Sequence, residues 1–189
     1  MGNRRDELLD AAIAVLGESG MHGLTHRRVE TAAGAPAGSA SNHFRTREAL
    51  LNAVVERFAE RDRQNWAAIT GGLRPVGPHE LAAALVEFAH AAAGEHRALT
   101  LARYAILVEA GIQPGLRAQL LRTGAGVNEW FLDWMRLAGS TAPERDAPII
   151  MNHWTGLVLH EVAVPDPAFD PAEQITTLVT SLLGAGVRA

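Results

Sequence analysis

The chain has 189 residues, which is enough to bury a hydrophobic core in one or two small domains. It contains no cysteine, so disulfides and thiolate metal sites are excluded. No apolar run approaches the ~20 residues that span a bilayer, and no charged-then-apolar leader opens the sequence. We therefore expect a cytoplasmic protein without a membrane segment.

The net charge of -4 is unusual for a protein that binds nucleic acid, but the positive charge is concentrated in one stretch. Residues 22–47 hold four arginines against a single acid, Glu30, together with three histidines. A small basic face on an otherwise acidic chain favours a local contact with phosphates and disfavours a broad coating of nucleic acid.

Apolar residues recur at helical spacing through most of the chain, and no stretch has the alternation of a strand. We therefore expect an all-α protein of about nine helices. The predicted helices cover residues 4–19, 26–33, 37–44, a stretch from after the N-cap Thr46 to about 69, 79–93, 97–110, a long helix that follows Gly111 and Pro114 and ends near Ala138, 143–163 and 172–185.

Residues 25–51 have the pattern of a helix, a tight turn and a second, short helix. Thr25 suits the N-cap of the first helix, Gly34 supplies its stop, and Pro36 suits the first turn of the next. The short helix carries small and hydrogen-bonding side chains on its outer side, and Phe44 anchors its end. A helix of this kind can enter a DNA major groove and reach bases and phosphates.

This stretch resembles the DNA-binding domain of the tetracycline-repressor (TetR) family. The resemblance rests on Leu8 to Gly20, Thr25, Ala33-Gly34, Gly38-Ser39, His43-Phe44, Arg47 and Leu50-Leu51. The chain departs from the family pattern at two positions: Ser41 stands where the family has a tyrosine, and Glu30 where it has a small residue. The resemblance implies three domains: a helix-turn-helix domain over 1–47, a connecting helix over 48–70, and a helical ligand-binding and dimerisation domain over 71–189. The Gly- and Pro-rich segment 71–78 supports the second boundary.

The resemblance also implies roles for single residues. Positions that face bases are Ala37, Gly38, Ser39 and Asn42, with Arg27 at the groove or its rim. Positions that contact phosphates are Ser41, His43 and Arg47. Arg28 is a further candidate, although it could equally be a solvated surface charge. The predicted DNA-binding residues are thus Arg27, Arg28, Ala37, Gly38, Ser39, Ser41, Asn42, His43 and Arg47.

Most aromatic residues lie after the helix-turn-helix. Aromatic residues at helical spacing are usually core, but several in one helical domain can also line an apolar cavity for a small molecule. The predicted ligand-binding residues are Phe88, Tyr104, Trp130, Trp134 and Trp154.

The last predicted helix carries the cleanest apolar stripe of the chain. Such a stripe can be ordinary core, but the resemblance implies that the last two helices pair with their copies in a second subunit. The predicted residues of this homodimer interface are Leu157, Ile175, Leu178, Val179 and Leu182. A two-fold dimer also suits a palindromic operator, because its two recognition helices read successive major grooves.

Two histidines, His153 and His160, are seven residues apart and share one helical face, with Glu161 next to the second. A metal site is conceivable, but no third ligand has suitable spacing and the zinc-protease pattern is absent, so we favour structural histidines. The sequence also lacks a nucleophile elbow, a phosphate loop and a dinucleotide fingerprint. We expect no enzyme activity, no cofactor and no metal.

These features together predict a transcriptional regulator, a repressor released from a palindromic DNA operator by a small-molecule effector. One alternative is an all-helical small-molecule-binding protein or enzyme without a DNA role, which specific, salt-sensitive DNA binding would exclude. A second alternative is a regulator without a ligand that is controlled by a protein partner.

Overall fold

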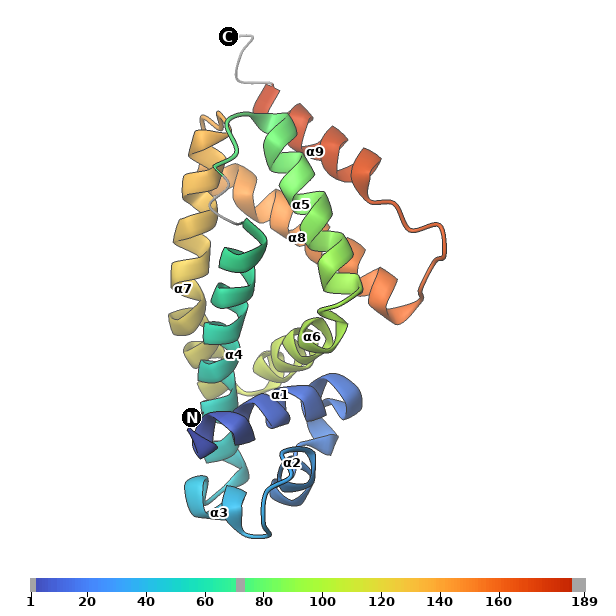
Figure 1. The fold of residues 1–189 in the computed structure, drawn as a ribbon. Helices are drawn as coiled ribbons and strands as arrows, with labels where there is room; N and C mark the ends of the chain where they lie inside the picture. The colour runs from blue at the N-terminus through green and yellow to red at the C-terminus, as the bar shows by residue number, and fades with distance from the viewer. Residues whose placement is uncertain (1–2, 71–73, 185–189) are drawn as a thin grey trace. The chain divides into compact units, whose positions relative to one another are not determined.

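The structure is a computed structural model that describes residues 3–70 and 74–184, and helices joined by turns and loops make up this part of the chain, without a strand (Figure 1). The all-α prediction is therefore confirmed, and the predicted helices are found close to their expected positions. The helices are α1 (Arg4–Gly23), α2 (His26–Ala32), α3 (Ser39–His43), α4 (Arg47–Thr70), α5 (Pro78–Ala93), α6 (Arg97–Ile112), α7 (Pro114–Leu137), α8 (Pro143–Ala163) and α9 (Ala172–Gly184).

The contacts group the chain into two compact units. The first unit comprises residues 1–64 and 96–124, and the second comprises residues 65–95 and 125–189. The helix-turn-helix thus shares its unit with α6 and with the first half of α7. The domain boundaries at 47 and 70 stay predictions.

The core of the first unit forms where α1, α2, α3 and α4 bury their apolar faces together with α6. Leu8, Leu16 and Leu50 are fully buried there. α1 packs along α6, and Gly17 lies so close to it that a Cβ atom at this position would overlap the carbonyl oxygen of Ala98. A glycine is therefore needed where these two helices meet.

Charged side chains join α4 to its neighbours within the same unit. Arg57 on α4 pairs with Asp10 on α1, and Asp62 on α4 pairs with Arg103 on α6. The guanidinium of Arg103 also lies over the ring of Phe58, 5.9 Å from its centroid. These pairs orient α4, the helix that follows directly after the helix-turn-helix.

The second unit is built from α5, α8 and α9 with the last part of α7. Trp154 on α8 is buried, and its indole Nε1 donates a hydrogen bond to the carbonyl oxygen of Leu85 on α5 at 2.9 Å. The apolar stripe of α9 faces α5, where Ile175, Val179 and Leu183 are buried. No helix in the described residues is long and apolar enough to cross a membrane.

Candidate DNA interface and ligand pocket

The two helices of the helix-turn-helix meet as the sequence predicts. The hydroxyl of Thr25 accepts a hydrogen bond from the backbone N–H of Arg28 at 3.3 Å and so caps α2. At its other end Gly34 adopts a φ of 58°, and the N–H groups of Gly34 and Ala35 return to the carbonyls of Thr31 and Glu30. This is the Schellman ending that a left-handed glycine allows.

The recognition helix α3 begins later than the sequence predicts. We expected helix from residue 37, but Pro36 to Ser39 form a β-turn instead, closed by a 3.1 Å hydrogen bond from the N–H of Ser39 to the carbonyl of Pro36. Gly38 sits at the third position of this turn with a φ of 87° and a ψ of -11°. A type II turn requires such a left-handed residue there, so Ala37 and Gly38 precede the helix.

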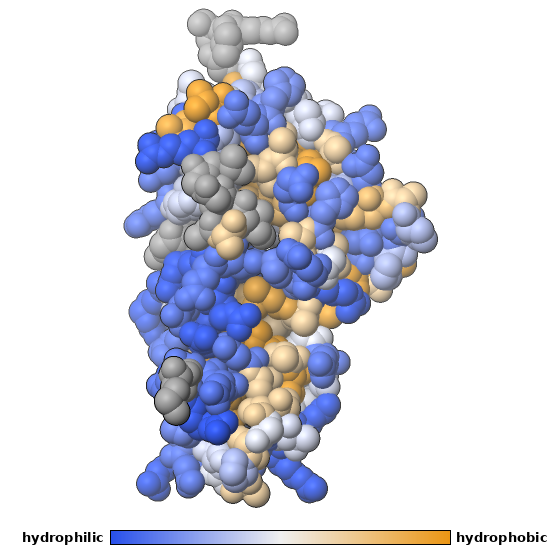
Figure 2. Space-filling view, viewed as in Figure 1, coloured by the Kyte–Doolittle hydropathy of each residue, from blue (hydrophilic) through white to orange (hydrophobic). Residues whose placement is uncertain are grey.

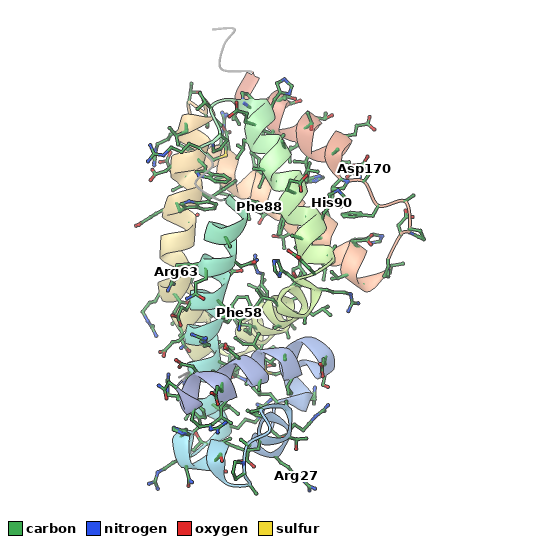
Figure 3. All side chains as sticks on the ribbon, viewed as in Figure 1. Arg27, Phe58, Arg63, Phe88, His90 and Asp170 are labelled. Atoms are coloured by element: carbon green, nitrogen blue, oxygen red, sulfur yellow. The ribbon has the colours of Figure 1, made fainter. Side chains whose placement is uncertain are left out.

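The predicted DNA-binding residues lie on α2, the 36–39 turn, α3 and the first residue of α4, and most of them are exposed. At this end of the first unit, Figure 2 shows hydrophilic side chains at the edges and near-neutral or weakly apolar ones between them. Arg27 projects outward from α2 (Figure 3). Gly38 and Ser39 are half-buried. The exposed members of the set are Arg27, Arg28, Ala37, Ser41, Asn42, His43 and Arg47.

Two of the candidate arginines are also tied to the end of α1. Arg28 Nη2 donates to the hydroxyl of Ser19 at 2.6 Å, and Arg47 Nη2 donates to the carbonyl of Met21 at 2.8 Å. A guanidinium has five N–H donors, so each side chain keeps donors for a further partner. These contacts hold both arginine side chains against the last turns of α1.

Two side chains of α2 that the sequence analysis did not assign to the site lie directly against α3. Glu30 is buried, and its Oε1 accepts a hydrogen bond from the backbone N–H of Ala40 at 2.9 Å. His26 Nε2 donates to the carbonyl oxygen of Phe44 at 2.6 Å. The spacing of four residues, which places both on one face of α2, is the signal that could have revealed them.

The structure brings together three of the five predicted ligand-binding residues in the second unit. The rings of Phe88 and Trp134 are stacked, with centroids 6.1 Å apart and planes 19° apart. Trp130 lies 4.3 Å from Trp134, centroid to centroid, and is only half-buried. Trp154 lies in the same unit, where its indole N–H bonds to the carbonyl oxygen of Leu85. Tyr104 belongs to the first unit, where burial raises the pKa of its phenol.

A pocket of about 370 Å³ opens beside Phe88 at the start of α5. Its volume falls in the range of small-molecule sites, and its walls combine apolar surface with two carboxylates. The other lining residues are Arg74, Pro75, Glu80, Ala83, Ala84 and Glu87.

A second, larger hollow of about 610 Å³ lies along the outer face of α8, beside the segment that leads into α9. His153 and His160 both line it, as their spacing predicts, together with Glu161 and Asp166. Within residues 3–70 and 74–184, no three histidines or acids are arranged to hold a metal ion.

The predicted dimer-interface residues divide into two groups. Ile175 and Val179 are buried within the chain itself, so their side chains stabilise the packing of α9 on α5. Leu157, Leu178 and Leu182 are only half-buried and remain accessible. The sequence could not separate the buried from the accessible residues of α9, because all four belong to one apolar stripe and the neighbouring helix covers only part of it.

Two family models match most of the chain. The model of bacterial regulatory proteins of the tetR family matches residues 8–54, and that of the tetracyclin repressor-like C-terminal domain matches residues 76–185. No curated protein gives a significant match.

Solved structures share the fold over nearly their full length. A regulator from Rhodococcus sp. placed in the TetR family is 22% identical, with 97% of this chain and 100% of that chain covered and a TM-score of 0.75. The multidrug-binding protein EbrR complexed with ethidium is 25% identical, with 96% and 99% covered and a TM-score of 0.72. The fatty acid degradation regulator FadR from Bacillus halodurans is 17% identical, with 100% and 98% covered and a TM-score of 0.72. The chain belongs to the TetR family and is a transcriptional regulator of that family.

Proposed function

We propose that this regulator is a repressor that binds a palindromic operator as a homodimer and is released from it by a planar aromatic effector. The observation that carries the proposal is the recognition surface, where exposed hydrogen-bonding side chains of α3 lie beside arginines of α2 and α4. Such a protein acts on the genome in the cytoplasm and needs neither a catalytic group nor a metal.

On DNA, Asn42 and Ser39 would read bases while Ser41, His43 and Arg47 hold phosphates. An asparagine can form two hydrogen bonds with adenine in the major groove, and Asn42 is exposed on α3. Hydroxyl and guanidinium groups are common phosphate partners that set the register of the protein on the duplex. Arg27, exposed on α2, would reach the rim of the groove.

The second copy would pack against the outer face of α8 and the accessible side of α9. Gly156 is exposed in the middle of this face, and nothing lies within 4 Å of the place where its Cβ would be. A glycine there lets a second helix approach closely, while Leu157, Leu178 and Leu182 offer half-buried apolar surface beside it. A two-fold dimer carries two recognition helices, and a palindromic operator offers two equivalent half-sites in successive major grooves, ~34 Å apart.

The effector would enter the pocket beside Phe88. Phe88 forms part of the apolar wall of this pocket, and Trp134 packs against Phe88. An apolar wall that includes an aromatic ring is typical of sites that bind aromatic ligands. EbrR, the relative that is 25% identical, was solved with ethidium and with proflavin, which are both planar and aromatic. We therefore propose an aromatic effector without strong negative charge, because two carboxylates, Glu80 and Glu87, and only one guanidinium, Arg74, line the same pocket.

The DNA part of the proposal is tested by selecting bound duplexes from a randomised pool with the wild-type protein. The expected result is a palindromic sequence whose affinity falls steeply with salt. Asn42→Ala should relax the preference at one base pair of each half-site, by about 1–3 kcal/mol if the contact is direct. A pool without any enrichment would rule out operator recognition.

The effector part is tested by titrating ethidium and proflavin with and without the selected duplex. Either ligand should quench tryptophan fluorescence, and ligand and operator should weaken each other's binding by the same factor, because the coupling is reciprocal. Phe88→Ala should abolish the quenching. If a ligand binds tightly with identical affinity in both titrations, the pocket does not control DNA binding.

A further inference from the structure

The recognition helix α3 is only five residues long, so it has little stability of its own. Fewer than about 12 residues rarely form a stable helix in water, and the first N–H groups and last carbonyls of any helix lack partners within it. The position of α3 therefore depends on the side chains that satisfy its two ends.

At the beginning of α3, the capping position is Gly38, which has no side chain to offer. The N–H of Ser39 is satisfied by Pro36 and that of Asn42 by Gly38, but Ala40 is fully buried and its N–H bonds to the carboxylate of Glu30. A buried donor without an acceptor costs about 1–3 kcal/mol. Glu30 thus supplies the cap that Gly38 cannot provide.

At the end of α3, the carbonyl oxygen of Phe44 accepts the hydrogen bond from His26. Because a carbonyl can only accept, His26 Nε2 must carry the proton. Both the neutral ring with a proton on Nε2 and the charged ring meet this condition, so the contact does not depend on the charge of His26.

His26 and Glu30 are one helical turn apart on the same face of α2, and they reach opposite ends of α3. We propose that these two side chains form a clamp that holds the recognition helix in its reading position, which makes them positioning residues for sequence-specific DNA binding. The inference rests on the proposed DNA recognition by α3. Neither residue needs to touch DNA for this role.

Removing a side chain of the clamp should reduce the specificity of DNA binding and leave the contacts between arginines and phosphates in place. Base contacts demand a position accurate to roughly 0.5 Å, whereas long arginine side chains tolerate small shifts of the backbone. Removing the acceptor at residue 30 should therefore weaken binding to the selected operator and leave binding to a scrambled duplex, and its salt dependence, nearly unchanged.

The test compares Glu30→Ala with Glu30→Gln, which keeps an oxygen acceptor of the same reach. Glu18→Ala, at an exposed position on α1, is the matched control. We expect Glu30→Ala to weaken operator binding about tenfold and scrambled-duplex binding less than twofold, while Glu30→Gln and Glu18→Ala stay within about threefold of wild type. At the other end, His26→Gln preserves a donor and should resemble wild type, whereas His26→Leu should resemble Glu30→Ala.

Hydrogen exchange of the Ala40 amide, measured without DNA, tests the clamp independently of operator recognition. Its exchange should accelerate at least about tenfold in Glu30→Ala and recover in Glu30→Gln. If wild type selects no operator but Ala40 exchange responds in this way, the proposed function fails and the clamp stands. Unchanged exchange, equal losses on operator and scrambled duplexes, or a Glu30→Gln variant as impaired as Glu30→Ala would overturn the inference.

Discussion

Arg57 on α4 holds Asp10 on α1 through two parallel hydrogen bonds, from Nε to Oδ1 at 2.8 Å and from Nη2 to Oδ2 at 2.9 Å. Arg57 also bonds Glu60 at 2.7 Å, and Arg61 reaches Asp10 at 3.0 Å. A bidentate pair between an arginine and a carboxylate has a defined geometry. This group of side chains therefore fixes the angle between α1 and α4.

The pair predicts a pH-dependent stability. The hydrogen bond from Arg57 is the largest cause that lowers the pKa of Asp10 from its ordinary value of 3.8. A carboxylate with a lowered pKa stabilises the folded state above its unfolded pKa, and this stabilisation is lost as the pH falls through the folded pKa.

We therefore expect Asp10→Asn to lower the free energy of unfolding by about 1 kcal/mol at pH 7, a value reduced by solvent because a third of the Asp10 side chain is exposed. The difference from wild type should shrink below about pH 4. Urea unfolding at several pH values measures it. Glu7→Gln, which breaks the more exposed pair with Arg4, is the control and should change stability by less than about 0.5 kcal/mol.

The close approach of α1 to α6 predicts that Gly17→Ala is destabilising. A methyl group there would overlap the backbone of Ala98, so the two helices must separate at a cost of about 1–3 kcal/mol. Gly111→Ala is the matched control, because Gly111 is also helical but has open space around it. That substitution should stabilise the protein by about 0.5–1 kcal/mol. Equal thermal shifts in the two variants would argue against the tight packing.

Arg47→Ala should weaken binding to all DNA sequences alike. Its guanidinium lies at the start of α4, where it already bonds the Met21 carbonyl and keeps donors for a phosphate. Loss of one phosphate contact should reduce the slope of log affinity against log salt by about one. Fluorescence anisotropy over a range of salt concentrations measures this slope. Arg63→Ala, on an exposed part of α4 beyond the helix-turn-helix, should leave it unchanged.

The proposed dimer contact at α8 predicts that Gly156→Trp gives a monomer. An indole on this face would occupy the space that a second helix needs, and dissociation should become easier by about 100-fold, equivalent to about 3 kcal/mol. Sedimentation velocity at micromolar concentration distinguishes the two states. Gly111→Trp, at another exposed helical glycine with open space, should remain dimeric. A monomeric wild type would remove the basis of the two-fold operator model.

The sequence by itself determined the helices and the helix-turn-helix of this protein, because their signals are local. Thr25 caps α2 as predicted, Thr46 accepts a hydrogen bond from the N–H of Ala49 at the start of α4, and Gly34 ends α2 in the left-handed conformation. Each of these features depends on residues within one turn, and the apolar spacing that defines a helix is equally short-ranged. The same local signals place the predicted DNA-binding residues on α2, the 36–39 turn, α3 and the start of α4.

Only the tertiary structure decided which residues that are distant in the sequence come into contact. The sequence presented Glu30 as a departure from the family pattern, whereas packing buries it against Ala40, ten positions further on. Tyr104 was grouped with the other aromatic residues but belongs to the first unit, and Ile175 and Val179 turn inward while Leu178 stays accessible. A helical stripe fixes which residues share a face but not which neighbour covers that face, because this depends on how the helices pack against one another.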